Sequence, residues 1–249
     1  FGVMKDAVQS ASFITPKKTA QLVEKLESLV SEGQAARLDG QVYMDNRVKC
    51  CNEEIYYTIE ILDRAIQAGR QVRFQYARRV LSAQMQVETQ EKEFLVNPYA
   101  LIWSGDHYYL VCNNPKYDNL MHARLDRIRR AKALDTPARD FREVSEYTDF
   151  FDAADYANQL FHMFSGETDT VELCCGRDMI EEILDRFGET ALLRTAGEDQ
   201  FLVKFEAKVS DGFVSWLMQY GDRAVVRSPL KLKTMLREKA RAILHNYGG

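Results

Sequence analysis

The chain has 249 residues, of which 46% are hydrophobic and 28% charged, and its formal net charge is −4 at pH 7. These proportions are ordinary for a globular protein, and the length allows two domains that each bury a core. No apolar run approaches the roughly 18 residues that span a bilayer, and no basic-then-apolar signal segment opens the chain. This argues against a membrane protein and predicts a cytoplasmic one. Because the chain starts at Phe1 rather than at Met, we expect it to be a piece of a longer protein.

Charge is distributed unevenly along the chain. Residues 64–142 carry 14 Lys and Arg against 8 Asp and Glu, whereas residues 143–199 carry 3 against 15. A basic region inside an acidic protein favours polyanionic partners. A solvated surface with scattered ion pairs has the same composition, so charge alone leaves both interpretations open.

The sequence lacks the motifs of common enzymes and metal sites. It has no dinucleotide fingerprint, phosphate loop, Gly-x-Ser-x-Gly elbow or His-Glu-x-x-His motif, and its four histidines are scattered. Two adjacent cysteine pairs, Cys50-Cys51 and Cys174-Cys175, have no further ligand at zinc spacing, so we interpret them as small apolar residues in a reducing cytoplasm. We therefore predict a protein that is not an enzyme and has no metal and no cofactor.

The first part of the chain is predicted to be helical. An apolar stripe runs through Val3–Ala11, and a second helix begins at Thr15-Pro16, a capping residue followed by proline, and ends near Gly33. A short strand is possible at Gln41–Met44, and a third helix runs from the cap Asn52 to Gly69. These helices form either a linker with a possible dimer face or a helical hairpin that packs on its own domain.

After the third helix the pattern changes to short strands with tight turns and no helix between them. This pattern indicates an antiparallel barrel or a strongly bent sheet. Full or nearly full closure of the sheet would hide its exposed edges. The predicted strands are Gln71–Tyr76, Val80–Glu88, Glu93–Trp103, His107–Asn113, Leu120–Asp126 and Ile128–Leu134.

The stretch Trp103–Leu134 organises this sheet. Because side chains alternate between the two faces of a strand, the arm Leu120–Asp126 has one apolar face and one face that carries His122, Arg124 and Asp126. Such a surface can hold an anionic ligand that also stacks.

Arginine and tyrosine side chains are the main candidates for ligand contacts. The guanidinium fork binds phosphate through two parallel hydrogen bonds, and its plane stacks on bases. A sheet that combines aromatic residues with arginine is a common plan for single-stranded nucleic acid or nucleotide binding. The predicted ligand-binding residues are Tyr76, Tyr108, Tyr109, His122, Arg124 and Arg127.

Two alternatives stay open at this site. Asp126 can pair with Arg124 or Arg127 and make the motif a staple of the fold, so we expect Asp126 and one arginine to be structural, with His122 and Arg124 exposed. Tyr108 and Tyr109 point to opposite faces, so one of them lies in the core. The sequence does not decide which.

The last third of the chain is predicted to be a second sheet domain. An acidic and aromatic connector with a short helix near Ala153–Phe164 precedes it. The βαββαβα order that follows suits a ferredoxin-like split sheet with helices on one face. The predicted elements are strand Thr168–Cys175, helix Met179–Phe187, strands Thr190–Ala196 and Gln200–Val209, helix Phe213–Tyr220, strand Ala224–Ser228 and helix Leu230–Tyr247.

Several segments resemble the WYL domain of transcriptional regulators, named for a Trp-Tyr-Leu triplet that precedes a strand ending in Arg-Leu-Asp-Arg-Ile. Here the triplet is Tyr108-Tyr109-Leu110, whose first position departs from the name but stays aromatic, and the second motif is Arg124–Ile128. Further similar segments are VRFQY at Val72–Tyr76, VNPYAL at Val96–Leu101 and NEEIYYTIEILDRAI at Asn52–Ile66. Residues that match the C-terminal WCX-type extension found with WYL domains are Trp216, Gly221-Asp222 and Ser228-Pro229.

The resemblance implies an α+β chain with N-terminal helices, a small Sm-like, SH3-type antiparallel β-barrel and a C-terminal ferredoxin-like domain. The expected domains are a helical linker or dimer region at 1–69, the WYL barrel at 70–135, a connector at 136–166 and the WCX-type extension at 167–249.

The resemblance also implies a function. We expect the ligand-sensing and oligomerisation part of a bacterial transcriptional regulator, whose WYL domain binds a nucleic acid or nucleotide-type anionic effector. The alternatives are a binding module for a non-nucleotide small anionic effector and a scaffold domain without ligand. Similar regulators read duplex DNA with a winged helix-turn-helix head, which these residues do not include. We therefore expect a homodimer that contacts duplex DNA only through a missing N-terminal domain, and no membrane partner.

Overall fold

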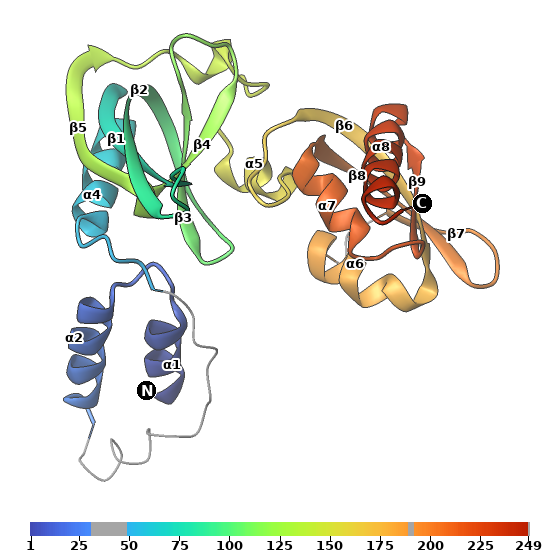
Figure 1. Cartoon of the computed structure of the whole chain (residues 1–249), viewed down its shortest axis with the longest axis horizontal. Coiled ribbons are helices and arrows are strands. Elements are labelled where there is room, and N and C mark those ends of the chain that lie inside the picture. The colour runs from blue at the N-terminus through green and yellow to red at the C-terminus, as the bar shows by residue number, and fades with distance from the viewer. Residues whose placement is uncertain (31–48, 189–191, 249) are drawn as a thin grey trace. The chain divides into compact units, whose positions relative to one another are not determined.

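The computed structural model describes residues 1–30, 49–188 and 192–248. The chain forms two compact units, Phe1–Phe151 and Asp152–Gly249, and each combines helices with an antiparallel sheet (Figure 1). The predicted α+β class is confirmed. The strand predicted at Gln41–Met44 and the helix end predicted at Gly33 lie outside the described residues. No helix in the described ranges is long and apolar enough to cross a membrane.

Within residues 1–30 and 49–69, three α-helices precede the sheet of the first unit. They are α1 (Gly2–Ser10), α2 (Pro16–Glu27) and α4 (Ile55–Gln67). The cap predicted for α2 is present, because Oγ1 of Thr15 accepts a hydrogen bond from the backbone N–H of Lys18 at 3.2 Å. An ion pair between Lys5 and Glu27, 2.9 Å long, joins α1 to α2.

The first unit contains a five-stranded antiparallel sheet with the order β4-β3-β2-β1-β5. Its strands are β1 (Arg70–Leu81), β2 (Val87–Ser104), β3 (His107–Asn113), β4 (Leu120–Arg124) and β5 (Ile128–Pro137). The separate strand predicted at Val80–Glu88 is wrong, because a turn lies there. The N–H of Ser82 donates to the carbonyl of Gln86 at 2.9 Å, and Met85 adopts φ 58°. The turn has no Gly or Pro to mark it in the sequence, which is why the strand pattern ran through it.

The sheet ends in a sharp bend and stays open. Strand β4 stops at Arg124, two residues before the predicted end, and Leu125–Arg127 forms a 3₁₀ turn that leads into β5. Among the described residues no ladder joins β4 to β5, so the predicted full closure into a barrel is not observed. The Sm-like, SH3-type detail of the prediction is not confirmed.

The core of the first unit lies between the sheet and α4. Alternate residues of β1, including Val72 and Phe74, are fully buried, as the period-two pattern predicts. Helix α4 adds Ile55 and Leu62 to the same cluster at its 3.6-residue spacing. Full burial of each such side chain contributes about 1.5–3 kcal/mol to the free energy of unfolding. This cluster therefore stabilises the sheet whose strand β4 carries His122 and Arg124.

The second unit contains a four-stranded antiparallel sheet with the order β7-β8-β6-β9. The elements are α5 (Ala153–Gln159), β6 (Glu167–Gly176), α6 (Ile180–Phe187), β7 (Leu192–Thr195), β8 (Gln200–Val209), α7 (Asp211–Met218), β9 (Ala224–Ser228) and α8 (Leu230–Asn246). Strands and helices follow one another in the predicted order from β6 to α8. The ferredoxin-like name for this arrangement is not confirmed.

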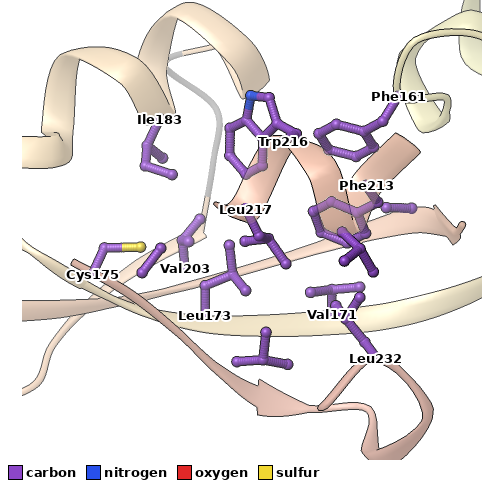
Figure 2. Close-up of a cluster of buried hydrophobic side chains, with 14 of the residues drawn as sticks. Phe161, Val171, Leu173, Cys175, Ile183, Val203, Phe213, Trp216, Leu217 and Leu232 are labelled. Carbon is purple, nitrogen blue, oxygen red and sulfur yellow. The ribbon is translucent and has the colours of Figure 1, made fainter. Parts of the chain in front are cut away.

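Aromatic residues from helices and loops cover one face of this second sheet. Figure 2 shows Phe161, Phe213 and Trp216 clustered above the sheet residues Val171 and Leu173. The rings of Phe161 and Phe213 stack with their centroids 4.1 Å apart. Both side chains are at most 2% exposed, so this cluster is the structural centre of the second unit.

Candidate functional site

A hollow of about 630 Å³ opens in the first unit, and six cations and one carboxylate line it; we call it the cationic hollow. Its walls come from the segments before α2 and α4, from strands β1 to β5 and from the bend between β4 and β5. The cations are Lys49, Arg78, Arg79, Arg124, Arg127 and Arg129, and the carboxylate is Asp126.

The side chain of Arg124 is held in the cationic hollow by Asp126 and His107. Its Nε and Nη2 donate to the two carboxylate oxygens of Asp126 at 3.0 and 2.8 Å, and Nη2 also lies 3.3 Å from Nδ1 of His107. The hydrogen bonds that Arg124 donates to Asp126 raise the pKa of Arg124 further. Burial alone would raise the pKa of Asp126, but the hydrogen bond and charge of Arg124 outweigh it and hold that pKa below its usual value. This pair is therefore an internal ion pair that is fully charged at neutral pH.

Two further cations of the hollow are tied to backbone carbonyls. Nη1 of Arg129 donates to the backbone carbonyl of Asp126 at 2.6 Å and to the backbone carbonyl of Ile128 at 3.1 Å. Nζ of Lys49 donates to the carbonyl of Ala11 at 3.0 Å, and burial lowers the pKa of this lysine. Both side chains thus fix the walls of the hollow, and their charges have no carboxylate partner within the described part of the chain.

The remaining cations have their hydrogen-bond donors available. Arg79 and Arg127 are exposed, and the side chain of neither makes a hydrogen bond or ion pair with any other described residue. The guanidinium of Arg78 lies 5.8 Å from the ring centroid of Tyr76, a cation–π contact that leaves its N–H groups free for a ligand. Each guanidinium offers five N–H donors. Arg79 and Arg127 are therefore the side chains best placed to take up an anion.

The histidine that lines the hollow is His107 rather than His122. Arginine only donates, so Nδ1 of His107 accepts from Arg124 and the imidazole is neutral in this arrangement. Burial and then the charge of Arg124 lower the pKa of His107. His122 lies on β4 opposite Val111, is half-buried and is not part of the lining.

The structure distinguishes the two neighbouring tyrosines. Tyr108 packs edge-on against Phe13 and Trp103, with ring centroids 5.2 and 4.9 Å away, and joins the edge of the core. Tyr109 lies on the other face, directly opposite Arg124 in the ladder. It is half-buried, and burial raises the pKa of its hydroxyl. Of the two, Tyr109 is on the side of the cationic hollow.

The six predicted residues are only partly brought together. Arg124 and Arg127 line the cationic hollow, and Tyr109 lies beside Arg124. Tyr76 is 8% exposed within a ring cluster, where its hydroxyl accepts from the backbone N–H of Arg124 at 3.3 Å. The expectation that Arg124 and His122 are exposed is wrong, because both are half-buried and the side chain of Arg124 is only 26% exposed. The ligand-binding role of all six stays a prediction.

Sequence reasoning missed the part of the hollow that comes from outside the Arg124–Ile128 motif. Arg78 and Arg79 follow the VRFQY segment after Ala77, so continuing the strand past Tyr76 would have found them. The N-terminal wall had no comparable signal. Ser12 reaches it because its hydroxyl donates to the carbonyl of Asp106 at 2.7 Å, a contact between residues 94 positions apart.

A second hollow in the same unit is larger but less charged. It measures about 710 Å³, and its charged side chains are Lys92, Lys116 and Glu93. Phe94, Leu95 and Tyr117 supply much of the rest of its lining. Two lysines and a glutamate leave little net charge, so the cationic hollow is the better candidate for an anion site.

Each of the two units contains one segment that matches a known domain family. Residues 57–133 match the family model of the WYL domain, and residues 167–244 match that of the WCX domain. A search of curated proteins finds no significant match. One similar solved structure is proteasome accessory factor B/C (PafBC) of Arthrobacter aurescens, with 19% sequence identity and a TM-score of 0.32. The alignment covers 87% of this chain and 30% of that one, so this chain spans about 30% of the length of its relative.

Proposed function

The chain carries a WYL domain followed by a WCX domain, and we propose that it is the ligand-sensing part of a transcriptional regulator. Its WYL domain binds an anionic effector in the cationic hollow, and this effector is a nucleic acid or a nucleotide. Contact with duplex DNA belongs to a different part of the whole protein.

The observation that carries the proposal is the surplus of positive charge in the hollow. Asp126 forms an ion pair with Arg124, whereas the side chains of Arg79 and Arg127 make no hydrogen bond or ion pair with the described residues. Several guanidinium groups that converge on a hollow with a single carboxylate suit phosphate, which accepts two parallel hydrogen bonds from each fork. A volume of about 630 Å³ is within the range of sites that enclose a ligand as large as a nucleotide.

A small anion without a base is the second candidate. The same arginines suit any phosphate or carboxylate, so charge alone does not select a nucleotide. Tyr109, on the strand beside Arg124, supports the nucleotide because its ring offers an aromatic edge close to the cations. A scaffold without ligand is the weakest alternative, since it leaves the unpaired arginines without a role.

The proposal includes a homodimer, through the Leu22–Val30 helix or the C-terminal sheet. Exposed apolar side chains support both surfaces: Leu29 follows α2, and Leu192 lies on the edge strand β7. Light scattering should give twice the 28.7 kDa mass of the chain at high micromolar concentration. A monomer under those conditions would remove this part of the proposal.

The test of the ligand proposal is a binding panel on residues 1–249. The purified protein is first checked for co-purifying nucleic acid by its absorbance at 260 and 280 nm. It is then titrated with short single-stranded oligonucleotides, mononucleotides and inorganic pyrophosphate. Arg79→Ala and Arg127→Ala should each weaken binding by about 1.5–3 kcal/mol, the scale of hydrogen bonds to charged groups. Affinity should also fall with added salt, because bound phosphates release counterions.

Arg73→Ala is the matched control. Arg73 is an exposed arginine on the same strand as Arg79, but it is not part of the lining of the hollow. Its removal should leave binding unchanged. Equal losses for Arg73→Ala and Arg79→Ala would mean that binding depends on net charge alone and would contradict the site. Stronger binding of pyrophosphate than of every nucleotide would favour the non-nucleotide effector.

A further inference from the structure

The hairpin of β1 and β2 extends beyond the rest of the sheet. Strand β1 pairs with β5 only up to Tyr76, and β2 pairs with β3 only from Asn97 onward. Residues 77–81 and 87–91 therefore form a two-stranded ribbon, which we call the hairpin arm. None of its residues is buried.

One face of the hairpin arm continues the wall of the cationic hollow. Residues that pair across an antiparallel ladder share a face, and so do residues two apart along a strand. Arg79 pairs with Thr89, and both line the hollow, as does Ala77 on the same face; the side chain of Arg78 also reaches the lining, although Arg78 pairs with Gln90 on the opposite face. The next pair toward the tip on the face of Arg79 is Leu81 with Val87. This apolar pair lies about 7 Å farther along the strand, at a rise of roughly 3.4 Å per residue.

The apolar pair is open to solvent. Leu81 is 62% exposed and Val87 is 69% exposed. A pair of aliphatic side chains at such an exposed position stabilises the ribbon little, because most of its surface stays in water. The pair is therefore available to cover the uncharged part of a ligand whose anionic part is held at Arg79.

The charges of the arm give the ligand a direction. On the other side of the Arg79–Thr89 pair, the same face carries Ala77 paired with Glu91, an exposed carboxylate. A carboxylate repels a second anionic group, whereas the aliphatic pair has no charge. A ligand whose phosphate lies at Arg79 thus gains by extending its uncharged group toward Leu81 and Val87.

We propose that Leu81 and Val87 form an apolar subsite that receives a nucleobase next to the phosphate bound at Arg79. This inference rests on the proposed function and deepens it. The effector is then a strand of at least two nucleotides, because one nucleotide occupies the cationic hollow and the base of the next packs on the arm. A mononucleotide or an inorganic anion fills only the first position.

The test compares two probes of equal charge on the whole chain of 249 residues. One is the 5′-phosphorylated thymidine dinucleotide, and the other carries an abasic sugar in place of its second nucleoside. The natural chain should bind the complete dinucleotide about five- to thirtyfold more tightly, the effect of one packed base. In the double variant Leu81→Thr with Val87→Thr this ratio should fall to about one, with the affinity for the abasic probe unchanged. Threonine is β-branched, so the strand conformation of the arm is kept.

Val80→Thr is the matched control, since Val80 belongs to the same arm but to its opposite face, where it pairs with Glu88. This variant should keep the full ratio. A ratio of one in the natural chain, or a ratio that survives in the double variant, overturns the subsite. So does tighter binding of octyl phosphate than of the dinucleotide through Leu81 and Val87, because the occupant is then an alkyl chain. If neither dinucleotide nor pyrophosphate binds at all, the proposed function itself fails, which separates the two outcomes.

Discussion

Each unit of the chain contains a half-buried arginine, and the partners that stabilise the buried positive charge differ between the two units. In the first unit, Arg124 is bound by the carboxylate of Asp126, and its pKa is raised. In the second, the guanidinium of Arg186 lies 4.5 Å from the ring centroid of Phe161 and donates to the carbonyl of Leu160 at 2.6 Å, and burial lowers its pKa. Both guanidinium groups are thus held by groups of the chain itself. Under the proposed function, anion binding depends on the cations whose donors stay available, and not on how many arginines a unit contains.

Among the changes around Arg186, removal of the Phe161 ring should lower stability most. Phe161→Ala should destabilise the second unit by about 3–5 kcal/mol, because it opens a cavity where the ring stacks on Phe213. Urea unfolding followed by the fluorescence of Trp216, in a Trp103→Phe background, measures this. Ligand binding in the cationic hollow should not change at urea-free conditions.

The control for that change is Phe164→Ala in the same background. Phe164 is 50% exposed, so its truncation should cost well under half as much as that of Phe161. Equal losses for the two variants would mean that the aromatic cluster is not the centre of stability of the second unit.

Removing the carboxylate in the first unit should have the next largest effect. Asp126→Ala leaves Arg124 half-buried without its partner, which should cost about 1–3 kcal/mol of stability. The pKa of Asp126 is lower in the folded chain than in the unfolded chain, where it is about 3.9. The ion pair therefore contributes its full stabilisation to the folded chain at pH values above 3.9, and this contribution is lost as the pH falls through the pKa of the folded chain. The stability difference between the natural chain and Asp126→Ala should therefore narrow in acid, as thermal melts between pH 7 and pH 2 would show.

Arg124→Ala decides between the two roles that the sequence left open for this residue. It should lower the melting temperature as Asp126→Ala does, because the two side chains form one pair. If Arg124 also contacts the ligand, affinity should fall by about 1.5–3 kcal/mol after the variant is shown to be folded. A destabilised Arg124→Ala chain that binds normally would make Arg124 a structural residue and leave Arg79 and Arg127 as the ligand contacts.

The sequence predicted more of the fold than of the site, for a physical reason. Periodicity reports which face of an element is buried, and the helix predicted from Asn52 to Gly69 and the strand predicted at Gln71–Tyr76 correspond to α4 and the first half of β1. It also showed that Tyr108 and Tyr109 point apart, although only the packing of Phe13 against Tyr108 determines which is inside. Local pattern carries no such information about distant partners.

The cationic hollow depends on contacts of that distant kind. Lys49 and Ser12 reach it only because the N-terminal segment packs against the β2–β3 turn, where Asp106 accepts the hydroxyl of Ser12. The hairpin arm was missed because its turn contains no Gly or Pro, although Met85 takes a positive φ there. A resemblance to known WYL domains identified the unit but did not supply either feature.

A substitution of Arg186 itself should have a smaller effect on stability. Arg186→Met keeps most of the aliphatic contact with the ring and loses the hydrogen bond to Leu160, so stability should fall by about 1 kcal/mol. Because this change leaves no charged side chain without its ion-pair partner, the loss of stability should be smaller than for Asp126→Ala. The Trp216 assay measures it, and a loss larger than that of Asp126→Ala would contradict the distinction between the two arginines.

The smallest expected effect is a pH dependence of anion binding that comes from His107. This imidazole faces Arg124, Asp126, Asp106 and Arg127, and burial and Arg124 keep its pKa low in the free chain. An anion bound in the hollow favours the imidazolium, so the complex takes up a proton and affinity should rise as pH falls from 8 to 6, by about two- to fivefold for a modest pKa shift. His107→Gln should remove this rise while binding at pH 8 is kept. His122→Gln is the matched control on the neighbouring strand: His122 lies outside the lining of the hollow, so this variant should keep the rise. If the dependence disappears with His122 and persists without His107, the neutral hydrogen bond between His107 and Arg124 has no part in binding, and the ligand lies on the β4 face instead.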